Sequence, residues 1–198
     1  MIDAAVVALL AGGPVILPTD TVYGLCAAPG SAPCERMYEV KGREPGKPTA
    51  LLAADLDVLL ECVPELRGRA GTIARALLPG PYTLILPNPA RRFAWLTGAN
   101  PYAIGVRVPR LPDDAERVLG PVGAVAATSA NAPGGPDPRR LEDIPDAILE
   151  RVGAVVDAGE LPGTPSTVLD FTQAEPRVVR EGAAPSAAAL AQVEAALA

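Results

Sequence analysis

The chain has 198 residues, a formal net charge of −6, three cysteines and no histidine. A chain of this length is expected to form one domain, here residues 1–198, with a sizeable core. Its composition, 49% hydrophobic and 20% charged, is typical of globular rather than disordered proteins. Without histidine, a Ser-His-Asp triad, a Cys-His dyad and a His-ligated zinc site are all excluded. Any chemistry must therefore use Lys, Arg, hydroxyl, Asn or carboxylate side chains.

The cysteines and the N-terminus predict a cytoplasmic protein. Cys26, Cys34 and Cys62 lack the C-x-x-C spacing of zinc and redox sites, so we expect three reduced, mostly buried thiols. The apolar stretch 4–10 has no basic segment before it and ends at glycine and proline, so it predicts a short helix rather than a signal peptide or membrane span. We expect no membrane partner, and the acidic net charge argues against a general nucleic-acid binder.

Helical and strand-like segments alternate along the first half of the chain. Strands are predicted at 15–17 and 49–53. Helices are predicted from a cap at Asp3 to residue 11, at 31–41, from a cap at Asp55 to residue 60, and at 67–78. The stretch 18–25 is expected to be a loop.

The second half repeats the alternation. Strands are predicted at 82–86, 104–108, 122–127, 154–157, 167–170 and 177–180. Helices are predicted at 113–119, at 141–152 from an amphipathic pattern, and at the alanine-rich C-terminus with Ser186 as its cap. This alternation predicts an α/β fold, a mixed sheet flanked by helices. Ligands of such folds usually bind in a crevice lined by loops beyond the strand ends.

The loop 18–25 concentrates polar groups directly after a strand. Thr19, Asp20 and Thr21 bring two hydroxyls and a carboxylate into three positions, and Tyr23-Gly24 follows. Such residues often form a turn by bonding to their own backbone. A turn alone does not require the Tyr-Gly pair, so we favour a site that binds polar groups.

The segment 41–47 contains every lysine of the chain, Lys41 and Lys47, in a sequence that otherwise uses arginine. Lysine is a compact charge for a phosphate or carboxylate, and Arg43 adds a planar, bidentate donor. Gly42 and Gly46 allow the backbone to approach a ligand. A solvated charged loop, or chance, is the alternative explanation; we favour an anion site.

Further polar residues stand at strand ends. Ser129 and Asn131, two apart in an extended segment, point to the same side, although a capped turn explains them equally well. Arg107 lies among apolar neighbours and needs either an internal carboxylate or an anionic ligand. Ser166 precedes one closing strand and Arg180 ends another. Neither a P-loop nor a G-x-G-x-x-G motif is present.

Taken in order, these segments resemble the YrdC/TsaC family of L-threonylcarbamoyladenylate synthases. The resemblance spans nearly the whole chain and rests on Gly12-Gly13, segment 18–25, Lys41 with Arg43, segment 79–83, Val106-Arg107, Ser129 with Asn131, Ser166-Thr167 and Arg180. It implies a YrdC-like fold in its single-domain form, an open twisted sheet with a concave, positively charged ligand cavity.

The resemblance also implies an activity. The family joins L-threonine, bicarbonate and ATP into threonylcarbamoyl-AMP and pyrophosphate. Other proteins, the expected partners, then transfer the threonylcarbamoyl group to the adenosine next to the anticodon of tRNA. Mg²⁺ is expected with the triphosphate and not at a site made by protein side chains alone. Weak direct binding of tRNA is left open.

The family's binding roles can be carried over by position. The threonine side would comprise Thr21, Arg107, Ser129 and Ser166. The ATP side would comprise Lys41, Arg43, Lys47, Asn131 and Arg180, with Lys41 and Arg43 also catalytic. The chain departs from the family pattern at Leu52, where a polar residue, commonly His, is frequent, at Pro165, where Glu is frequent, and at 132–135.

Two other functions remain as alternatives. Hydrogenase-maturation carbamoyltransferases contain the same fold and form a carbamoyl adenylate from carbamoyl phosphate and ATP, but they carry zinc-finger-like cysteines and acylphosphatase segments that are not found here. A non-catalytic RNA-binding module of this fold would show strongly salt-dependent RNA binding and no ATP turnover. The two lysines and the Ser129–Asn131 pair favour the enzyme.

Overall fold

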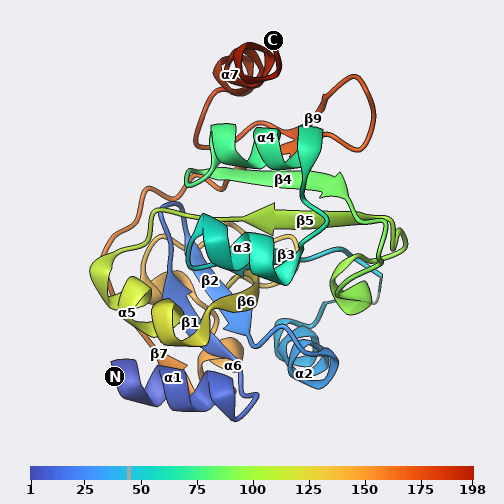
Figure 1. Ribbon diagram of the computed structural model, residues 1–198. Coiled ribbons are helices and arrows are strands. Elements are labelled where there is room, and N and C mark those ends of the chain that lie inside the picture. The colour runs from blue at the N-terminus through green and yellow to red at the C-terminus, as the bar shows by residue number, and fades with distance from the viewer. Residues whose placement is uncertain (44–45) are drawn as a thin grey trace.

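The computed structural model describes residues 1–43 and 46–198, and within them a single mixed β-sheet is flanked by helices (Figure 1). The sheet order is β7-β1-β2-β6-β3-β5-β4-β8-β9. Its strands are β1 (Val15–Pro18), β2 (Tyr23–Ala27), β3 (Ala50–Ala53), β4 (Tyr82–Pro87), β5 (Ala103–Arg107), β6 (Ala124–Ser129), β7 (Ala154–Val155), β8 (Thr167–Asp170) and β9 (Arg177–Arg180). The predicted mixed α/β sheet is confirmed.

The helices stand close to the ranges that their patterns predict, with one exception described below. They are α1 (Ile2–Leu10), α2 (Ser31–Lys41), α3 (Leu56–Cys62), α4 (Gly68–Leu77), α5 (Asp113–Val122), α6 (Asp146–Leu149) and α7 (Ser186–Leu197), with 3₁₀ turns η1 (Ala94–Leu96) and η2 (Leu141–Asp143). Within the described residues, no helix is long and apolar enough to cross a membrane.

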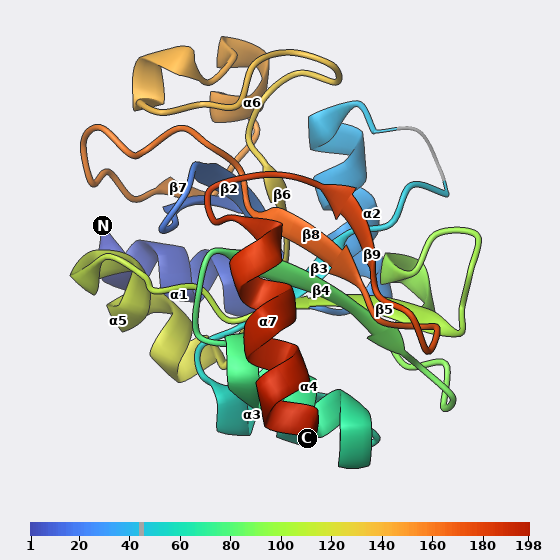
Figure 2. The same ribbon diagram turned by 90° about the horizontal axis from the view of Figure 1, so that it is seen from above.

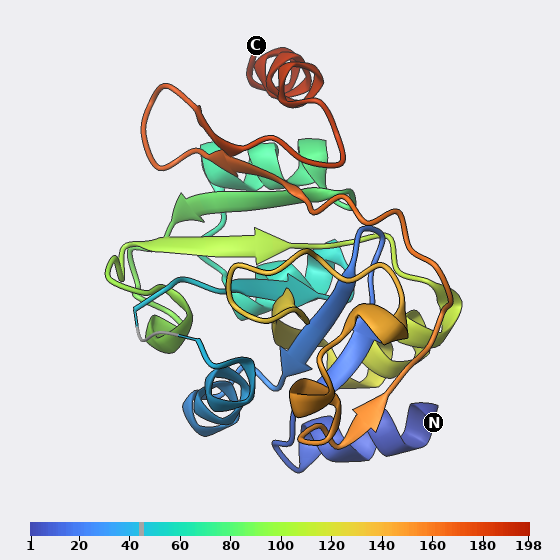
Figure 3. The ribbon, with the colours of Figure 1, turned by 180° about the vertical axis from the view of Figure 1, so that it is seen from behind.

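The two faces of the sheet are covered unequally. One face carries Leu51, Leu84 and Val106 into the main core, which residues of α2, α3, α4, α6 and α7 complete. Figure 1 shows α3 and α4 in front of this face, and Figure 2 shows α7 lying against α4. The opposite face packs against α1 and α5 at one end, through a second cluster that includes Leu17 and Leu52. No helix among the described residues packs flat on the remainder of that face, and the segment after β6 crosses in front of it (Figure 3).

The expected helix at 141–152 is wrong. The segment instead forms the separate turns η2 and α6, and Pro145 stands between them. Proline has no amide hydrogen to donate and its ring clashes with the preceding turn, so the helix cannot continue through this position. The apolar periodicity reflects burial of Ile144 and Ile148 in the main core.

The loop expected at 18–25 is shorter than predicted. Tyr23–Ala27 forms β2, which pairs antiparallel with both β1 and β6. Small residues such as Gly24, Cys26 and Ala27 carry little strand signal of their own, and it is the two flanking strands that hold them extended. The strand expected at 122–127 is likewise shifted and runs from Ala124 to Ser129.

Only one of the three predicted helix caps is present. Asp55 is the N-cap of α3, and its carboxylate accepts a hydrogen bond from the Val58 amide at 2.8 Å. The caps predicted at Asp3 and Ser186 are wrong because each residue lies inside its helix, after an N-cap residue that makes no side-chain cap bond.

The cap of α3 gives a stability prediction. We expect Asp55→Ala to lower the free energy of unfolding by about 1 kcal/mol, because one amide of the first turn loses its acceptor. Asp57→Ala is the matched control, since Asp57 is also exposed and lies in the same turn without capping it. Urea denaturation of both variants measures the difference, and equal losses would contradict the assigned cap.

Candidate active site

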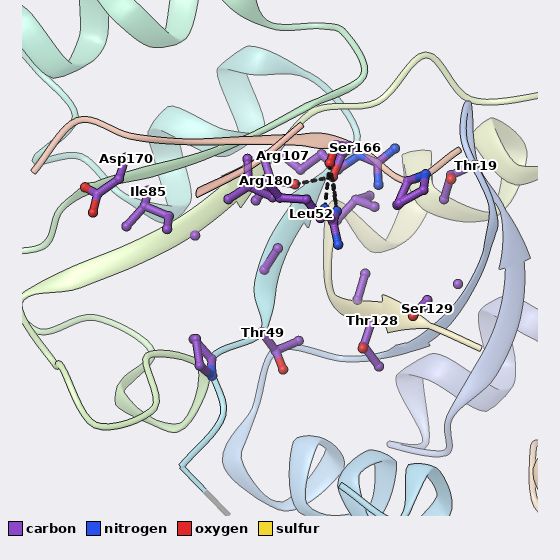
Figure 4. A pocket seen from close by; sticks show the side chains of 18 of the residues that line it. Thr19, Thr49, Leu52, Ile85, Arg107, Thr128, Ser129, Ser166, Asp170 and Arg180 are labelled. Carbon is purple, nitrogen blue, oxygen red and sulfur yellow. Dashed lines mark hydrogen bonds between the residues drawn. The ribbon is translucent and has the colours of Figure 1, made fainter. Parts of the chain in front are cut away.

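The uncovered part of the sheet forms the floor of a cavity of about 490 Å³. The strand register aligns Ala127, Ala50, Gly105 and Ile85 in a row across β6, β3, β5 and β4, and all of them line the cavity. Three of these four side chains are a methyl group or a hydrogen, so few atoms project from the floor into the cavity. The larger polar side chains that line the cavity stand at strand ends and loops around this floor (Figure 4).

Arg107 stands at the end of β5 and is neutralised by Asp20. Its Nη2 donates to a carboxylate oxygen of Asp20 and, at 2.8 Å, to the Thr21 hydroxyl. The second Asp20 oxygen accepts the Arg110 amide at 3.1 Å. Arg107 lines the cavity, and its buried Nε has no hydrogen-bond partner among the described residues. The arginine therefore has a carboxylate partner, although its guanidinium is not fully hydrogen-bonded.

Ser166 and Arg180 form a second polar group beside Arg107 (Figure 4). Arg180 donates from Nη2 to the Ser166 carbonyl at 2.7 Å and reaches the Ser166 hydroxyl at 3.2 Å. The Ser166 hydroxyl lies 2.8 Å from that of Thr83 on β4. Burial lowers the pKa of the Arg180 guanidinium, although arginine remains charged at neutral pH.

Arg43 brings a third guanidinium group to the cavity wall. Its Nη1 donates to the Thr128 hydroxyl at 3.3 Å and its Nη2 to the Pro48 carbonyl at 2.6 Å. Arg43 Nε, like that of Arg107, is buried without a partner among the described residues. Burial lowers the pKa of this guanidinium as well. Two incompletely bonded guanidinium groups that line one cavity suit an anionic ligand.

Lys41 lies behind the wall and does not line the cavity. Its side chain is buried, and Nζ donates to the Ser129 carbonyl at 2.6 Å and to both the carbonyl and side-chain oxygens of Asn131. The Ser129 hydroxyl donates to Asn131 Oδ1 at 2.7 Å, and Asn131 Nδ2 donates to the Gly135 carbonyl at 2.6 Å. The lysine thus joins the end of α2 to the end of β6.

Five of the residues predicted from the sequence lie on the cavity surface: Arg43, Arg107, Ser129, Ser166 and Arg180. Thr21, Lys41 and Asn131 are buried and contact that set from behind. Lys47 is exposed and is not among the lining residues. Residues 44 and 45 of the predicted anion loop lie outside the described residues.

Sequence reasoning missed several lining residues. Thr128 and Asp137 both line the cavity. The carboxylate of Asp137 favours the charged forms of Lys41 and Arg180, and so partly offsets the lowering of their pKa values by burial. Asp137 stands between Pro136 and Pro138, and this rigid sequence is the local signal by which it could have been found. Asp170 lies at the end of the cavity away from Thr19 in Figure 4, and the sequence around it carries no comparable signal.

The fold and this cavity define an α/β protein that lines a cavity on an open sheet face with arginine and hydroxyl groups. A sequence model of the Sua5/YciO/YrdC family, described as telomere recombination, matches residues 7–182. The chain belongs to this family, as its motifs predicted.

Two curated relatives show what the chain is similar to. A threonylcarbamoyl-AMP synthase of Stenotrophomonas maltophilia (strain K279a) is 36% identical over 168 residues, covering 82% of this chain and 88% of that protein. A threonylcarbamoyl-AMP synthase of Pyrococcus abyssi (strain GE5 / Orsay) is 32% identical over 179 residues, covering 86% of this chain. The alignment covers 51% of the P. abyssi protein, so the chain spans about half the length of that relative.

A solved structure shares the fold over almost the whole chain. The structure of P. abyssi Sua5 complexed with L-threonine superposes with a TM-score of 0.85 at 30% identity. The superposition covers 99% of this chain and 57% of that one. The predicted fold class is therefore confirmed by a relative of known structure.

The Asp20–Arg107 pair gives a second stability prediction. We expect Asp20→Ala to lower the free energy of unfolding by about 3 kcal/mol, because a mostly buried guanidinium then loses its counter-charge. Asp114→Ala is the control, since it breaks the exposed pair with Arg117 and should change stability by less than about 0.5 kcal/mol. Denaturant unfolding curves measure both, and a loss for Asp20→Ala no larger than the control would refute the argument.

Lys41 gives a prediction of pH dependence. Burial, reinforced by the charge of Arg43, lowers the pKa of Lys41 from 10.5 to about 8. The folded protein thus binds the Lys41 proton more weakly than the unfolded chain does. The contribution of Lys41 to the free energy of unfolding therefore rises as the pH increases from about 8 to 10.5. The ¹³Cε signals of labelled lysine measure this midpoint, with Lys47→Arg assigning Lys41. A midpoint near 10.5 would show that the ammonium is not buried as described.

Proposed function

We propose that this chain is a threonylcarbamoyl-AMP synthase, which makes threonylcarbamoyl-AMP and pyrophosphate from L-threonine, bicarbonate and ATP. The observation that carries the proposal is the convergence of Arg43, Arg107 and Arg180 on one cavity of a chain with net charge −6. Three cations from separate segments that line one cavity favour a polyanionic substrate. The names of the family relatives point to the same reaction.

The threonine side of the cavity is proposed to lie around Arg107. Arg107, a guanidinium that lines the cavity, is the candidate for the substrate carboxylate, while Ser166 and Ser129 supply hydroxyls near the amino acid. Thr21 acts from behind, by fixing the guanidinium through its 2.8 Å hydrogen bond. A planar guanidinium that is already oriented loses little entropy when a carboxylate binds.

The ATP side is proposed to lie around Arg43 and Arg180. These guanidinium groups would neutralise phosphate charge directly, and Lys47 would contribute from segment 46–49. Lys41 would add its charge from behind the wall and hold the ends of α2 and β6 together through Asn131. Mg²⁺ would arrive with the triphosphate as part of the substrate.

The proposed reaction has two steps. The threonine amine attacks bicarbonate, and loss of water leaves a carbamate with a new N–C bond. A carbamate oxygen then attacks the α-phosphorus of ATP, the bond to the β-phosphate oxygen breaks, and pyrophosphate departs with that electron pair. Both steps bring anions together, so the protein contributes mainly by positioning them and neutralising their charge. Neither step requires an imidazole base.

The remaining expectations form part of the same proposal. Residues 1–198 would act as one domain, because the described strands belong to a single sheet. The product would pass in the cytoplasm to proteins that transfer the threonylcarbamoyl group to tRNA. A carbamoyl-adenylate-forming enzyme would instead require carbamoyl phosphate, and an RNA-binding module would not turn over ATP.

Pyrophosphate release tests the function. Purified protein with Mg-ATP and bicarbonate is expected to release pyrophosphate only when L-threonine is added, and serine or carbamoyl phosphate should not replace it. Release driven by carbamoyl phosphate would identify the alternative enzyme. A folded protein without threonine-dependent release would refute the proposal.

The two sides of the cavity should be separable by mutation. Arg43→Ala is expected to lower kcat/KM for ATP by at least tenfold, as loss of a charge-assisted phosphate contact of about 1.5–3 kcal/mol predicts, and Lys41→Ala should also slow turnover. Ser129→Ala should chiefly raise the KM for threonine. Unchanged rates in both cation variants, or an unchanged threonine KM in Ser129→Ala, would sink the corresponding assignment.

A further inference from the structure

Near Arg43, residues 93–100, the η1 loop, form part of the cavity wall through Thr97 and Asn100, and neither the sequence motifs nor the proposed reaction assign this loop a role. The base of this loop is closed by the buried Asn88. Its Nδ2 donates to the Arg92 carbonyl at 2.9 Å and to the Pro101 carbonyl at 3.0 Å, and its Oδ1 accepts the Arg92 amide at 3.0 Å. One side chain therefore fixes both ends of the loop.

The η1 loop is also fixed to α2. The Tyr38 hydroxyl donates to the Trp95 carbonyl at 3.0 Å, and Trp95 Nε1 donates to the Pro29 carbonyl at 3.1 Å. The rings of Phe93 and Trp95 pack edge to face with centroids 6.0 Å apart. The loop is thus attached to the helix whose end bears the Lys41–Arg43 segment.

Gly98 brings the η1 loop into backbone contact with segment 46–49. Gly98 has a φ of +63°, and a Cβ there would lie 2.4 Å from the Gly46 carbonyl oxygen and 3.0 Å from the Pro48 nitrogen. Next to this contact the Thr49 amide donates to the Leu96 carbonyl at 2.8 Å. Any side chain at position 98 would push segment 46–49 away, because backbone atoms leave no room for it.

Segment 46–49 in turn sets the direction of the Arg43 guanidinium. The Pro48 carbonyl accepts Nη2 at 2.6 Å and the Thr128 hydroxyl accepts Nη1 at 3.3 Å, so both terminal nitrogens of the guanidinium are held by acceptors. The guanidinium is planar, so these two acceptors define the direction of its remaining Nη N–H groups. A shift of the Pro48 carbonyl must rotate or release this group.

We propose that Gly98 is a positioning residue: the close approach of the η1 loop to segment 46–49 holds the Pro48 carbonyl in place, and this carbonyl orients Arg43 toward a phosphate group. The inference rests on the proposed function in taking that phosphate to belong to ATP. Gly98 itself touches neither the substrate nor the reacting atoms.

Binding of inorganic tripolyphosphate, measured by calorimetry, tests the proposal without requiring turnover. Gly98→Ala is expected to weaken binding about tenfold, equivalent to about 1.4 kcal/mol. Gly68→Ala is the matched control, because Gly68 also has a positive φ, +53°, but a Cβ there would meet nothing within 4 Å. The control carries a comparable backbone strain and should bind tripolyphosphate like the wild type.

A double-mutant cycle separates positioning from general destabilisation. In an Arg43→Ala background, Gly98→Ala should cause no further loss of affinity, because its effect passes through the guanidinium. Tyr38→Phe removes one attachment of the loop and should weaken binding two- to threefold, which keeps the test available if Gly98→Ala does not fold.

The possible outcomes distinguish this inference from the proposed function. Equal affinity in Gly98→Ala and wild type, or an additive loss in the Arg43→Ala background, would overturn it, as would failure of the wild type to bind tripolyphosphate. If Gly98→Ala and Tyr38→Phe weaken binding while the wild type releases no pyrophosphate with threonine, the positioning role stands and the proposed reaction does not.

Discussion

The site depends on how a guanidinium group is accommodated at the end of a buried strand. Arg107 follows Val106 into the sheet, where an unpaired charge would be costly. Asp20 supplies the counter-charge from the turn between β1 and β2, and its second oxygen holds the Arg110 amide. This pair connects two segments that are 87 residues apart in sequence. The interaction that stabilises the fold therefore also holds the Arg107 side chain at the cavity surface.

A second constraint is the unequal covering of the sheet. Five of the described helices contribute to the core on one face, whereas α1 and α5 cover only one end of the other. The open region is possible because Ala50, Gly105 and Ala127 expose little apolar surface, so leaving them uncovered costs little hydrophobic free energy. The arginines then stand around a low apolar floor, where charge interactions are stronger than in bulk water. An acidic chain can in this way present a locally cationic cavity.

The two lysines of the chain differ in burial, and this difference separates the roles that the sequence motif assigns to both. The sequence suggests that Lys41 and Lys47 act alike, as point charges toward an anion. In the structure Lys41 is 5% exposed and bonds to carbonyl and amide oxygens at the end of β6, whereas Lys47 is exposed. Charge in this segment is therefore divided between a buried ammonium that joins two elements and the guanidinium of Arg43 on the cavity wall.

The sequence by itself determined the mixed α/β class, most helix ranges and most of the polar residues that gather around the cavity, because periodicity and motif residues are local properties. It did not predict β2, whose small residues are held extended by β1 and β6, nor the break at Pro145 in a segment whose apolar pattern imitates a helix. Only the tertiary structure decided which polar residues face the cavity and which lie behind it. It also brought Asp137 to the cavity and Gly98 against Pro48, since both contacts join segments that no local pattern relates. Which side chains face the cavity, and which distant residues touch, depends on strand register and chain packing. These are fixed only when distant segments meet.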